Sequence, residues 1–530
     1  MKKIIVLILL STFYLSHSQE TLGLILDDAN AVKSDGYTLF NPRSDDRVFL
    51  IDNCGEVMRQ WDFSGRKSVS SYILENGNIL QSSRFDADIR DWDNNILWGI
   101  NYQDTFGFEI HHDIEPLPNG NFLVLVRDIY TNTEMFAEGL DTSYILDTLV
   151  LERILEIQPV GTDSAQIVWE WKLFDHLVQN FDNTKPNFGV VADNPQLLDM
   201  NFDNGNASNL IHANALDYNE DLDQLAFSSR SLSEVFVIDH STTTVEAASH
   251  TGGTYGKGGD FLWRWGNPEV YDQGTAADRK LGRQHDIKWI TEGPTQGMMS
   301  VFSNDGYGND FFASSIHILD QSDTNGVYSM DSGKFLPQDY FWSWDGVIMG
   351  EVMHAAAQSG LQILSNGNAL INESDIGRLT EVDPAGNILW VYRIPVGNDL
   401  DFDQFSQPEG NGAFRAHRYP SNYVGFNGLA FNNTGIIENQ NSISDDCVNR
   451  LSVDDSELND LSVFPNPTRD ILNFEFARRI DRIQVYSMTG KKVLSKSDSD
   501  FINLENLAKG MYIVEVSIDN NSEFVKVLKD

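Results

Sequence analysis

Residues 112–128, HDIEPLPNGNFLVLVRD, decide the fold, because they combine an apolar strand, a polar turn and a second apolar strand. Two later stretches repeat this pattern behind a histidine: HANALDYNEDLDQLAFSSR at 212–230 and HDIKWITEGPTQGMMSVFSND at 285–305. A unit that recurs along a chain indicates a repeat architecture in which each copy packs against the next. We therefore expect each copy to present one imidazole at an equivalent position.

Tight turns recur between the apolar runs. The sequences LENGN, LPNGN and LSNGN occupy residues 74–78, 117–121 and 364–368. Their Asn-Gly pairs tolerate the positive φ angles of a tight β-hairpin. Other segments end in aromatic residues at alternate positions, which places the rings on one side of a strand. These residues are Trp169 and Trp171, Trp263 and Trp265, Trp342 and Trp344, and Trp390 and Tyr392.

Turn and aromatic strand recur together at irregular spacings of roughly 45 to 100 residues, which is typical of a β-propeller whose blades carry insertions. The predicted fold is all-β: a six-bladed β-propeller over residues 19–431, followed by a small C-terminal β-sandwich. A closing strand is expected within 413–431. The blades are expected to begin near residues 36, 70, 110, 210, 285 and 355.

Composition limits the partners of this chain. Its 530 residues include 78 acidic and 37 basic ones, which gives a formal charge of -41. Binding to nucleic acid requires clustered Lys and Arg that neutralise phosphates, so we exclude a nucleic-acid partner. An acidic, well-solvated surface suits a secreted protein.

The N-terminus has the features of an export signal. Residues 1–18 combine two lysines, an apolar run over residues 4–15 and a short polar end, as a cleaved signal peptide does. No later stretch reaches the length of a membrane helix, so no transmembrane segment is expected. The mature protein is predicted to leave the cytoplasm, where Cys54 and Cys447 could form at most one disulfide.

The composition changes after the expected propeller. Residues 432–460 are polar and acidic without periodicity, which predicts a linker. Residues 461–530 alternate short apolar strands with turns, which predicts a compact β-sandwich. The segments FPNP (464–467), VYSMTGKKV (485–493) and KGMYIVEV (509–516) make this module resemble the C-terminal sorting domain of the type IX secretion system of Bacteroidetes. The resemblance implies contact with that secretion machinery, export across the outer membrane, and a secreted or cell-surface location.

Three imidazoles and one guanidinium stand at the ends of the repeated segments. The innermost strand of every propeller blade lines the central channel, so His112, His212, Arg230 and His285 are expected to meet near the axis. Imidazole N–H donors and a guanidinium suit a tetrahedral oxyanion, and one neutral nitrogen is left as a nucleophile. A metal site of three histidines is the rival interpretation. We expect no metal, because such a site gains little from a nearby cation such as Arg230.

At these residues the chain resembles the PAPS-independent aryl-sulfate sulfotransferases over roughly residues 36 to 431. The resemblance implies a six-bladed propeller that moves a sulfuryl group from an aryl sulfate donor to a phenolic acceptor without a cofactor. The motifs that carry it are DGYTLF at 35–40, HHDIEPLPNGN at 111–121, IHANAL at 211–216, SSR at 228–230 and GRQHD at 282–286.

Residue by residue, the resemblance implies that His285 accepts the sulfuryl group. It also implies that His212, Asn214, Arg230 and one histidine of the 111–112 pair hold the sulfate oxygens. His112 is favoured because it aligns with His212 and His285, and His111 remains an alternative.

Sulfuryl transfer, like phosphoryl transfer, is expected to pass through a loose transition state, in which preorganised donors supply most of the catalysis. An N-sulfohistidine intermediate splits the transfer into two easier steps. The second step needs a base for the incoming phenol, for which His212 and His112 are both candidates. Asp286 or a backbone carbonyl could fix the tautomer of His285.

Two other classes of function remain open on the sequence alone. One is a non-catalytic adhesin or glycan-binding propeller, and the other is a metal-dependent hydrolase on the same scaffold. His354 and His417 also flank apolar segments and are weaker candidates for the channel. Glu373 and Asp375 could line the channel, but turn carboxylates are the favoured interpretation. The DYNEDLD stretch at 217–223 is interpreted as a hairpin turn and not as a calcium-binding loop, because it lacks the glycine and the distal glutamate of an EF-hand loop.

Overall fold

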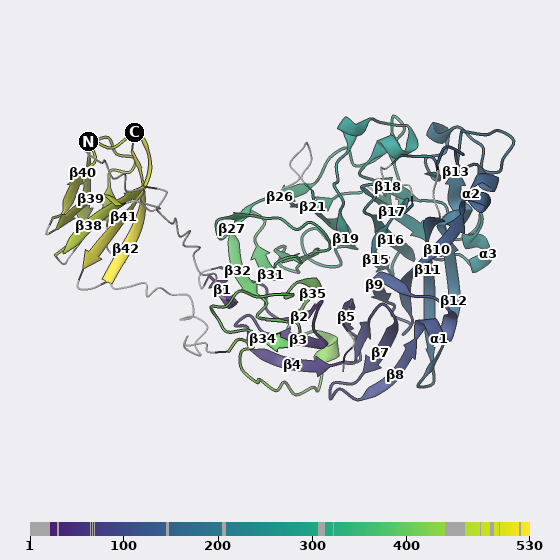
Figure 1. Cartoon of the computed structure of the whole chain (residues 1–530), viewed down its shortest axis with the longest axis horizontal. Coiled ribbons are helices and arrows are strands. Elements are labelled where there is room, and N and C mark those ends of the chain that lie inside the picture. The colour runs from purple at the N-terminus through teal and green to yellow at the C-terminus, as the bar shows by residue number, and fades with distance from the viewer. Residues whose placement is uncertain are drawn as a thin grey trace, which may run out of the picture. The chain divides into compact units, whose positions relative to one another are not determined.

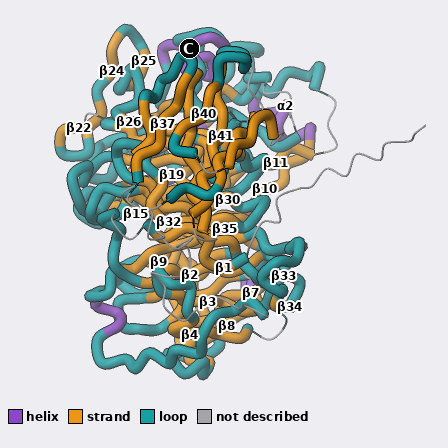
Figure 2. Tube along the Cα trace, turned by 90° about the vertical axis from the view of Figure 1, so that its left-hand side faces the viewer, coloured by secondary structure: helices purple, strands orange, loops and turns teal. Residues whose placement is uncertain are grey.

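The computed structural model of this chain divides into two compact units, Met1–Ser442 and Ile443–Asp530. The expected signal peptide, Cys447 and most of the expected linker lie outside the described residues. Among the helices and strands of the described part, strands far outnumber helices in both units (Figure 2). The structure describes residues 22–28, 31–63, 65, 67, 69–144, 148–203, 208–305, 313–321, 323–439, 462–476, 479–487, 492–497, 499–518 and 521–529.

Six antiparallel sheets of the first unit are the blades of a β-propeller, as predicted. Each innermost strand contacts the next around a closed ring, and the last contacts the first. The inner strands lie toward the middle of this unit and β4, β8 and β12 lie farther out (Figure 1). In ring order the inner strands are β5 (Ser70–Ile73), β9 (Ile110–Pro116), β15 (Ala213–Asn219), β19 (His285–Trp289), β29 (Gly360–Ile363) and β35 (Ala413–Tyr419).

The remaining blade strands follow outward from each inner strand. We number the blades one to six in the same order as the inner strands. Blade one continues with β6 (Ile79–Ser82), β7 (Asp86–Arg90) and β8 (Ile96–Asn101), and blade two with β10 (Phe122–Thr131), β11 (Thr148–Val160) and β12 (Ser164–Lys172). Blade three continues with β16 (Gln224–Ser229), β17 (Glu234–Asp239) and β18 (Trp263–Trp265), and blade four with β20 (Met299–Ser303), β21 (Ser315–Leu319) and β26 (Trp342–Trp344). Blade five continues with β30 (Ala369–Glu373), β31 (Arg378–Val382) and β32 (Ile388–Arg393), and blade six with β2 (Tyr37–Pro42), β3 (Arg47–Ile51) and β4 (Val57–Asp62).

The ring is closed by pairing distant parts of the chain. The predicted closing strand is β35, which pairs with β2, so blade six joins residues 413–419 to the N-terminal strands. A further strand, β1 (Gly23–Asp27), adds to the outer edge of blade five through β32. Both ends of the propeller sequence are thereby fixed to the ring.

The turn and aromatic motifs occupy equivalent places in different blades. Gly77, Gly120 and Gly367 have φ angles of 82°, 86° and 87° in the hairpins that join the first two strands of blades one, two and five. The aromatic pairs lie on β12, β18, β26 and β32, the fourth strands of blades two to five. Trp171, Trp263 and Trp390 are fully buried, so these strands seal the outer core of their blades.

Helices and additional strand pairs are short segments outside the blade strands. Among the described residues, no helix has the length and apolarity that crossing a membrane requires. The helices are α1 (Tyr102–Phe106), α2 (Asn132–Glu138), α3 (Thr244–Ala247), η1 (Leu173–His176), η2 (Val191–Asp193), η3 (Pro268–Tyr271), η4 (Ala276–Asp278) and η5 (Val424–Phe426). The strand pairs are β13 (Leu177–Val178) with β14 (Leu198–Asp199), β22 (Asp323–Thr324) with β23 (Val327–Tyr328), β24 (Met330–Asp331) with β25 (Lys334–Phe335), β27 (Val347–Ile348) with β28 (Glu351–Val352), and β33 (Val396–Gly397) with β34 (Leu400–Asp401).

The second unit is the small β-sandwich that the sequence predicts. Its two sheets bury a shared apolar core that includes Leu472, Val485 and Val514. One sheet contains β36 (Ser462–Phe464), β37 (Ile471–Glu475) and β40 (Phe501–Asn503); the other contains β38 (Arg482–Ser487), β39 (Lys492–Ser497), β41 (Gly510–Ile518) and β42 (Asn521–Lys529).

Candidate functional site

The histidines of the repeated segments stand at the heads of three consecutive inner strands. His112 lies in β9, His212 immediately precedes β15 and His285 begins β19. Each strand has an irregular register at this end, where it departs from regular pairing with its neighbour. His112 and His212 also adopt left-handed backbone angles, with φ of 60° and 50°. Such bulges re-aim side chains, here toward the channel.

The structure brings the four predicted groups together. The ring centroids of His112 and His212 are 4.9 Å apart. Burial lowers the pKa of His112 well below its usual range, and His111, His212 and His285 lower it further. The pKa of His212 falls to about 4, chiefly through burial, with Arg230 among the nearby cations that lower it. All three rings and Arg230 therefore share one electrostatic environment.

His285 has its tautomer fixed by its neighbours. Its Nδ1 lies 2.6 Å from Oδ1 of Asn304 and 3.1 Å from the carbonyl oxygen of Arg283, so Nδ1 carries the proton. The Asn304 amide cannot be reversed, because its Nδ2 donates to the carbonyls of Ala355 and Gln358 at 2.9 and 3.0 Å. Nε2 therefore keeps its lone pair, which accepts the Gln358 backbone N–H at 3.2 Å.

Electrostatics keep this imidazole neutral. Burial lowers the pKa of His285 well below its usual range, and Arg415 and Arg230 lower it further. The sequence predicted that Asp286 or a backbone carbonyl fixes the tautomer of His285. The Arg283 carbonyl contacts the ring, whereas the Asp286 carboxylate has other partners. The Asp286 carboxylate instead pairs with Arg415, 2.8 Å from its Nε, and accepts the Leu361 backbone N–H.

His212 has the opposite tautomer. Asn209 donates from Nδ2 to Nδ1 of His212 at 2.9 Å, and its Oδ1 accepts the His212 backbone N–H at 3.1 Å. This second bond fixes the orientation of the amide, so Nδ1 of His212 is an acceptor. The proton of the neutral ring is on Nε2, which makes His212 a hydrogen-bond donor.

His111 and His112 form a chain that ends on a carboxylate. Their Nδ1 atoms are 2.6 Å apart, and Nε2 of His111 lies 2.7 Å from Oε2 of Glu152. Because the carboxylate accepts, His111 carries its proton on Nε2 when neutral and accepts from Nδ1–H of His112. Nε2 of His112 is then left with a lone pair.

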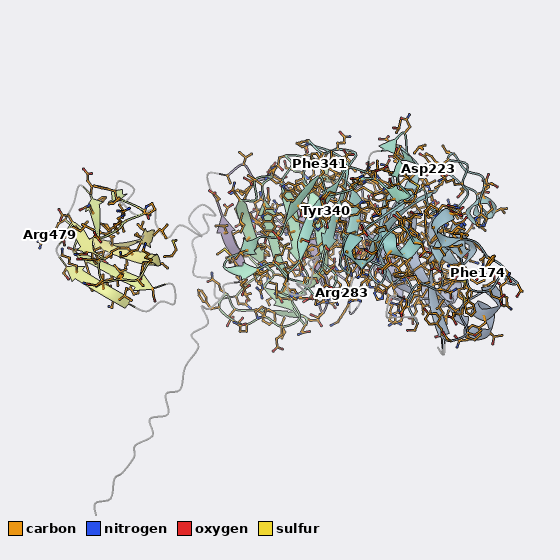
Figure 3. The ribbon with its side chains drawn as sticks, turned by 90° about the horizontal axis from the view of Figure 1, so that it is seen from above. Phe174, Asp223, Arg283, Tyr340, Phe341 and Arg479 are labelled. Atoms are coloured by element: carbon orange, nitrogen blue, oxygen red, sulfur yellow. The ribbon has the colours of Figure 1, made fainter. Side chains whose placement is uncertain are left out.

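Two unpaired guanidinium groups make this site cationic within an acidic protein. No described residue forms a hydrogen bond or ion pair with the guanidinium of Arg230 or of Arg127. Burial lowers the pKa of Arg230, and Arg283 lowers it further. Arg283, which is labelled in Figure 3, is held by an ion pair with Asp305. Arg127 and His112 line a cavity of about 210 Å³, together with Val69, Arg84, Ile110, His111, Gln358 and Phe414.

Asn214 lies at the same end of β15 but is occupied by the protein. Its Nδ2 donates to the Gln284 carbonyl at 2.9 Å, and its Oδ1 accepts from the Ser228 hydroxyl. The amide thus ties blade three to the residue that precedes His285. In this structure both polar atoms of the Asn214 side chain have protein partners, and the amide positions the segment that leads to His285.

A buried ionic layer lies beside the histidines. The Arg415 guanidinium pairs with Asp286 and approaches Asp113 at 3.7 Å. Lys288 lies 3.6 Å from both Glu115 and Asp217. These charges join inner strands β9, β15, β19 and β35 and hold their heads in a fixed arrangement.

The weaker candidates have structural partners. His417 is partly buried, and its ring centroid lies 4.7 Å from that of Tyr72. Glu373 forms a buried ion pair with Arg378, and Asp375 accepts the Ala356 backbone N–H at 2.6 Å. The backbone N–H of His354 donates to Glu373 at 3.2 Å. Stretch 217–223 joins β15 to β16 as the expected hairpin turn.

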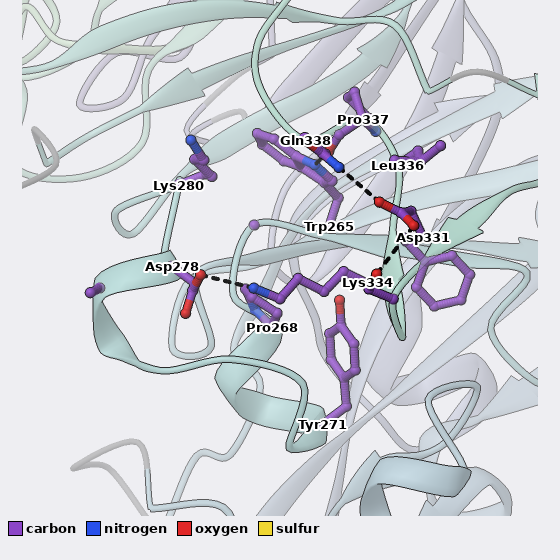
Figure 4. Close-up of a pocket in the computed structure, with 14 residues that line it drawn as sticks. Trp265, Pro268, Tyr271, Asp278, Lys280, Asp331, Lys334, Leu336, Pro337 and Gln338 are labelled. Carbon is purple, nitrogen blue, oxygen red and sulfur yellow. Dashed lines mark hydrogen bonds and ion pairs between the residues drawn. The ribbon is translucent and has the colours of Figure 1, made fainter.

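A larger cavity of about 420 Å³ lies elsewhere, between the fourth strand of blade three and the insertions of blade four (Figure 4). Its charged groups have partners: Lys334 pairs with Asp278 at 2.8 Å, Gln338 donates to Asp331 at 2.9 Å, and Lys280 pairs with Asp339 at 3.3 Å. It contains none of the histidines. The chemistry of the site is therefore concentrated in the channel.

Sequence reasoning missed Asn304, Glu152, Gln358 and Arg415. One signal for Asn304 was present: it directly follows β20, as Arg230 directly follows β16. The others come from segments without a repeated motif, so nothing in the sequence placed them beside the histidines.

The fold and the site define a six-bladed β-propeller with a histidine-rich, cationic centre at the heads of its inner strands. Residues 24–310, more than half of the chain, match the family described as "Arylsulfotransferase (ASST)". The chain belongs to this family. Residues 462–530 match "Secretion system C-terminal sorting domain", so the protein is directed across the outer membrane to the cell surface or the medium.

Several solved structures are similar to this chain at low identity. A protein of unknown function from Bacteroides caccae is 14% identical, with a TM-score of 0.37, 68% of this chain covered and 94% of the other. A streptogramin B lyase is 11% identical, with a TM-score of 0.32 and coverages of 71% and 89%. The Dos1 propeller is 8% identical, with a TM-score of 0.30 and coverages of 96% and 95%. No curated protein sequence is significantly similar to the chain.

Proposed function

We propose that the protein transfers a sulfuryl group from an aryl sulfate to a phenol through a sulfohistidine at His285. The observation that carries this proposal is the Nε2 lone pair of His285, whose ring is buried beside His212 and Arg230. The Arg230 guanidinium has no hydrogen-bond or ion-pair partner among the described residues. A neutral nucleophile next to fixed cationic and N–H donors suits attack on an anionic sulfate ester. Family membership supports the same class of reaction.

In the first half-reaction Nε2 of His285 forms a bond to sulfur. The bond between sulfur and the aryl oxygen breaks, and its electron pair leaves on the phenolate, which takes a proton from water. Arg230 and Nε2–H of His212 stabilise the charge on the non-bridging oxygens. The Gln358 backbone N–H, which bonds Nε2 at 3.2 Å, must move away as sulfur approaches.

In the second half-reaction the tautomers favour His112 over His212 as the base. His212 presents Nε2–H, whereas His112 presents a lone pair on Nε2. The phenol gives its proton to His112, its oxygen bonds sulfur, and the N–S electron pair returns to His285. His112 can pass Nδ1–H to His111, which then pairs as an imidazolium with Glu152. His111 thus acts through His112, as a positioning and relay residue.

A chromogenic aryl sulfate, with and without added phenol, tests the function. Sulfated phenol and ping-pong kinetics are expected. Release into water that a chelator abolishes would instead indicate a metal-dependent hydrolase. Complete inertness of the folded protein toward a panel of aryl sulfates would indicate a binding propeller and would overturn the proposal.

We propose in addition that the C-terminal unit is the part recognised by the type IX secretion machinery. Its match to a sorting domain supports this partner. The natural donor and acceptor are expected to be an aryl sulfate and a phenol that fit the cavity between Arg84, Arg127 and Phe414.

A further inference from the structure

A second cluster of ligating side chains lies outside the channel, at the outer rim. His176 ends η1, which follows β12 in blade two, and His250 and Asp260 lie in the loop between α3 and β18 of blade three. Helix α3 contacts β12 at this rim (Figure 1). Nδ1 of each histidine approaches the same carboxylate oxygen, Oδ1 of Asp260, at 2.8 and 2.7 Å. All three atoms lie within 4.8 Å of one another.

The tautomer of His176 is set for a ligand role. Its Nε2 lies 2.7 Å from the Ala247 carbonyl oxygen, which can only accept, so Nε2 carries a proton. The neutral ring then aims its Nδ1 lone pair at Asp260. A ring lone pair and a carboxylate oxygen 2.8 Å apart need a proton or a cation between them. Metal-ligating histidines typically donate their second N–H to a carbonyl in this way, and the metal replaces that proton.

The surroundings hold His176 rigidly while leaving the cluster accessible. The His176 ring is buried parallel to Trp171, at 5.6 Å and 4°. Trp171 donates to the Gly259 carbonyl at 2.8 Å, and a Cβ at Gly259 would lie 2.6 Å from Nε2 of His176. His250, by contrast, has 58% of its side chain exposed. Solvent can therefore reach the third ligand.

We propose that His176, His250 and Asp260 bind a divalent transition-metal ion such as zinc, which fastens blade two to blade three. Two imidazole nitrogens and one carboxylate oxygen, with a position left for water, form a ligand set that suits zinc. The channel is a separate site: neither of the two potential metal clusters among the described residues contains His112, His212 or His285. The proposal does not depend on the sulfuryl-transfer reaction.

Zinc content tests this site directly. The full chain, stripped with a chelator and then dialysed against zinc chloride, is expected to retain one zinc ion per chain by elemental analysis. His250→Ala is expected to lose that ion, whereas His212→Ala retains it. His250 is largely exposed, so the variant should fold, and its Tm in chelator should equal that of the wild type. Zinc should raise the Tm of the wild type and leave that of His250→Ala unchanged.

Cobalt provides an independent spectroscopic readout. Cobalt added to the chelator-treated protein should give visible absorption bands of low-coordinate Co²⁺, and His250→Ala should abolish them. Absence of stoichiometric zinc in the wild type would overturn the proposal. So would loss of zinc in His212→Ala with retention in His250→Ala, because the ion would then belong to the channel.

Discussion

The proton positions on the channel histidines follow from amides and carbonyls whose own orientations are fixed. Asn304 leaves a lone pair on Nε2 of His285, and Asn209 leaves a proton on Nε2 of His212. Two imidazoles in one site therefore present different atoms at Nε2, a lone pair on His285 and an N–H donor on His212. This difference depends on the hydrogen-bond partners of each ring, Asn304 and Asn209, which a histidine motif does not reveal.

The pH dependence of the first half-reaction is a prediction at this scale. Lowered pKa values keep His285 and His212 neutral below the ordinary histidine value, and that of His212 is about 4. The rate of aryl sulfate cleavage should therefore stay level as the pH falls through 6.5, the usual pKa of histidine. It should decline only as the pH approaches about 4. A pre-steady-state pH profile measures this, and a midpoint near 6.5 would contradict it.

Glu152→Gln tests the relay behind His112. The amide keeps the shape of the side chain but cannot stabilise an imidazolium at His111. We expect transfer from the sulfo-enzyme to phenol to slow by about 10²-fold, the usual scale of general base catalysis. Sulfation of the enzyme should be nearly unchanged. Single-turnover measurements separate the two steps, and an equal loss in both would refute the relay.

Site residues could be predicted from the sequence only where they belong to a repeated segment. His112, His212, His285 and Arg230 were identifiable because they stand at equivalent ends of similar strands. Glu152 and Arg415 could not be identified, since β11 and β35 supply them through contacts that only the closed ring creates.

At the scale of elements, bulged strand heads point the histidines into the channel while their hairpins stay regular. The register shifts occur next to His112, His212 and His285, and each of these strands joins the next strand of its blade through a hairpin at its other end. Of these three hairpins, that of β9 contains an Asn-Gly pair. The turn motifs predicted the hairpins, because an Asn-Gly pair has few alternatives. A bulge has no comparable signal in a single sequence, so it could not be foreseen.

His240 links two blades through charge, and its contribution to stability depends on pH. It lies between Asp223 (Figure 3) and Glu156 of β11, at 2.8 and 3.1 Å. Hydrogen bonds and charge from these carboxylates outweigh the burial that opposes them and raise the pKa of His240 to about 9. A raised folded-state pKa stabilises the protein fully below the unfolded value of about 6.5. This stabilisation is lost as the pH rises through about 9.

His240→Gln should therefore lower the free energy of unfolding at pH 6 and make little difference at pH 10. Urea unfolding of both proteins across this range measures the difference. A difference that stays constant with pH would show that the ion pairs contribute nothing. Thr243→Ala, which removes the nearby cap of α3, provides a control whose effect should be independent of pH over this range.

At the scale of the whole molecule, fold class and blade number could be predicted because turns and aromatic strands recur. The position of each strand within its blade was harder to predict. The first blade was expected to begin near residue 36, but β2 is the second strand of blade six. β2 takes this place because β35 pairs with it as the innermost strand and closes the ring. Pairing between strands more than 370 residues apart leaves no pattern in the local sequence.

The division into two units predicts separable functions. A chain that ends at residue 460 keeps the whole propeller and should retain the aryl sulfate activity of the full chain within about twofold, the usual scatter of such effects. The same truncation should block export in a host with the type IX machinery. Cell fractionation and activity assays measure both, and export of the truncated chain would contradict the assigned role of the second unit.

The central claim is that His285 carries the sulfuryl group. Mass spectrometry of the wild type, quenched under alkaline conditions after exposure to an aryl sulfate without phenol, should find one sulfuryl group on the peptide that contains His285. Phenol should remove the group, and His285→Ala should show neither the modification nor turnover. Wild-type turnover in folded His285→Ala, or a sulfuryl group on another residue, would contradict the account.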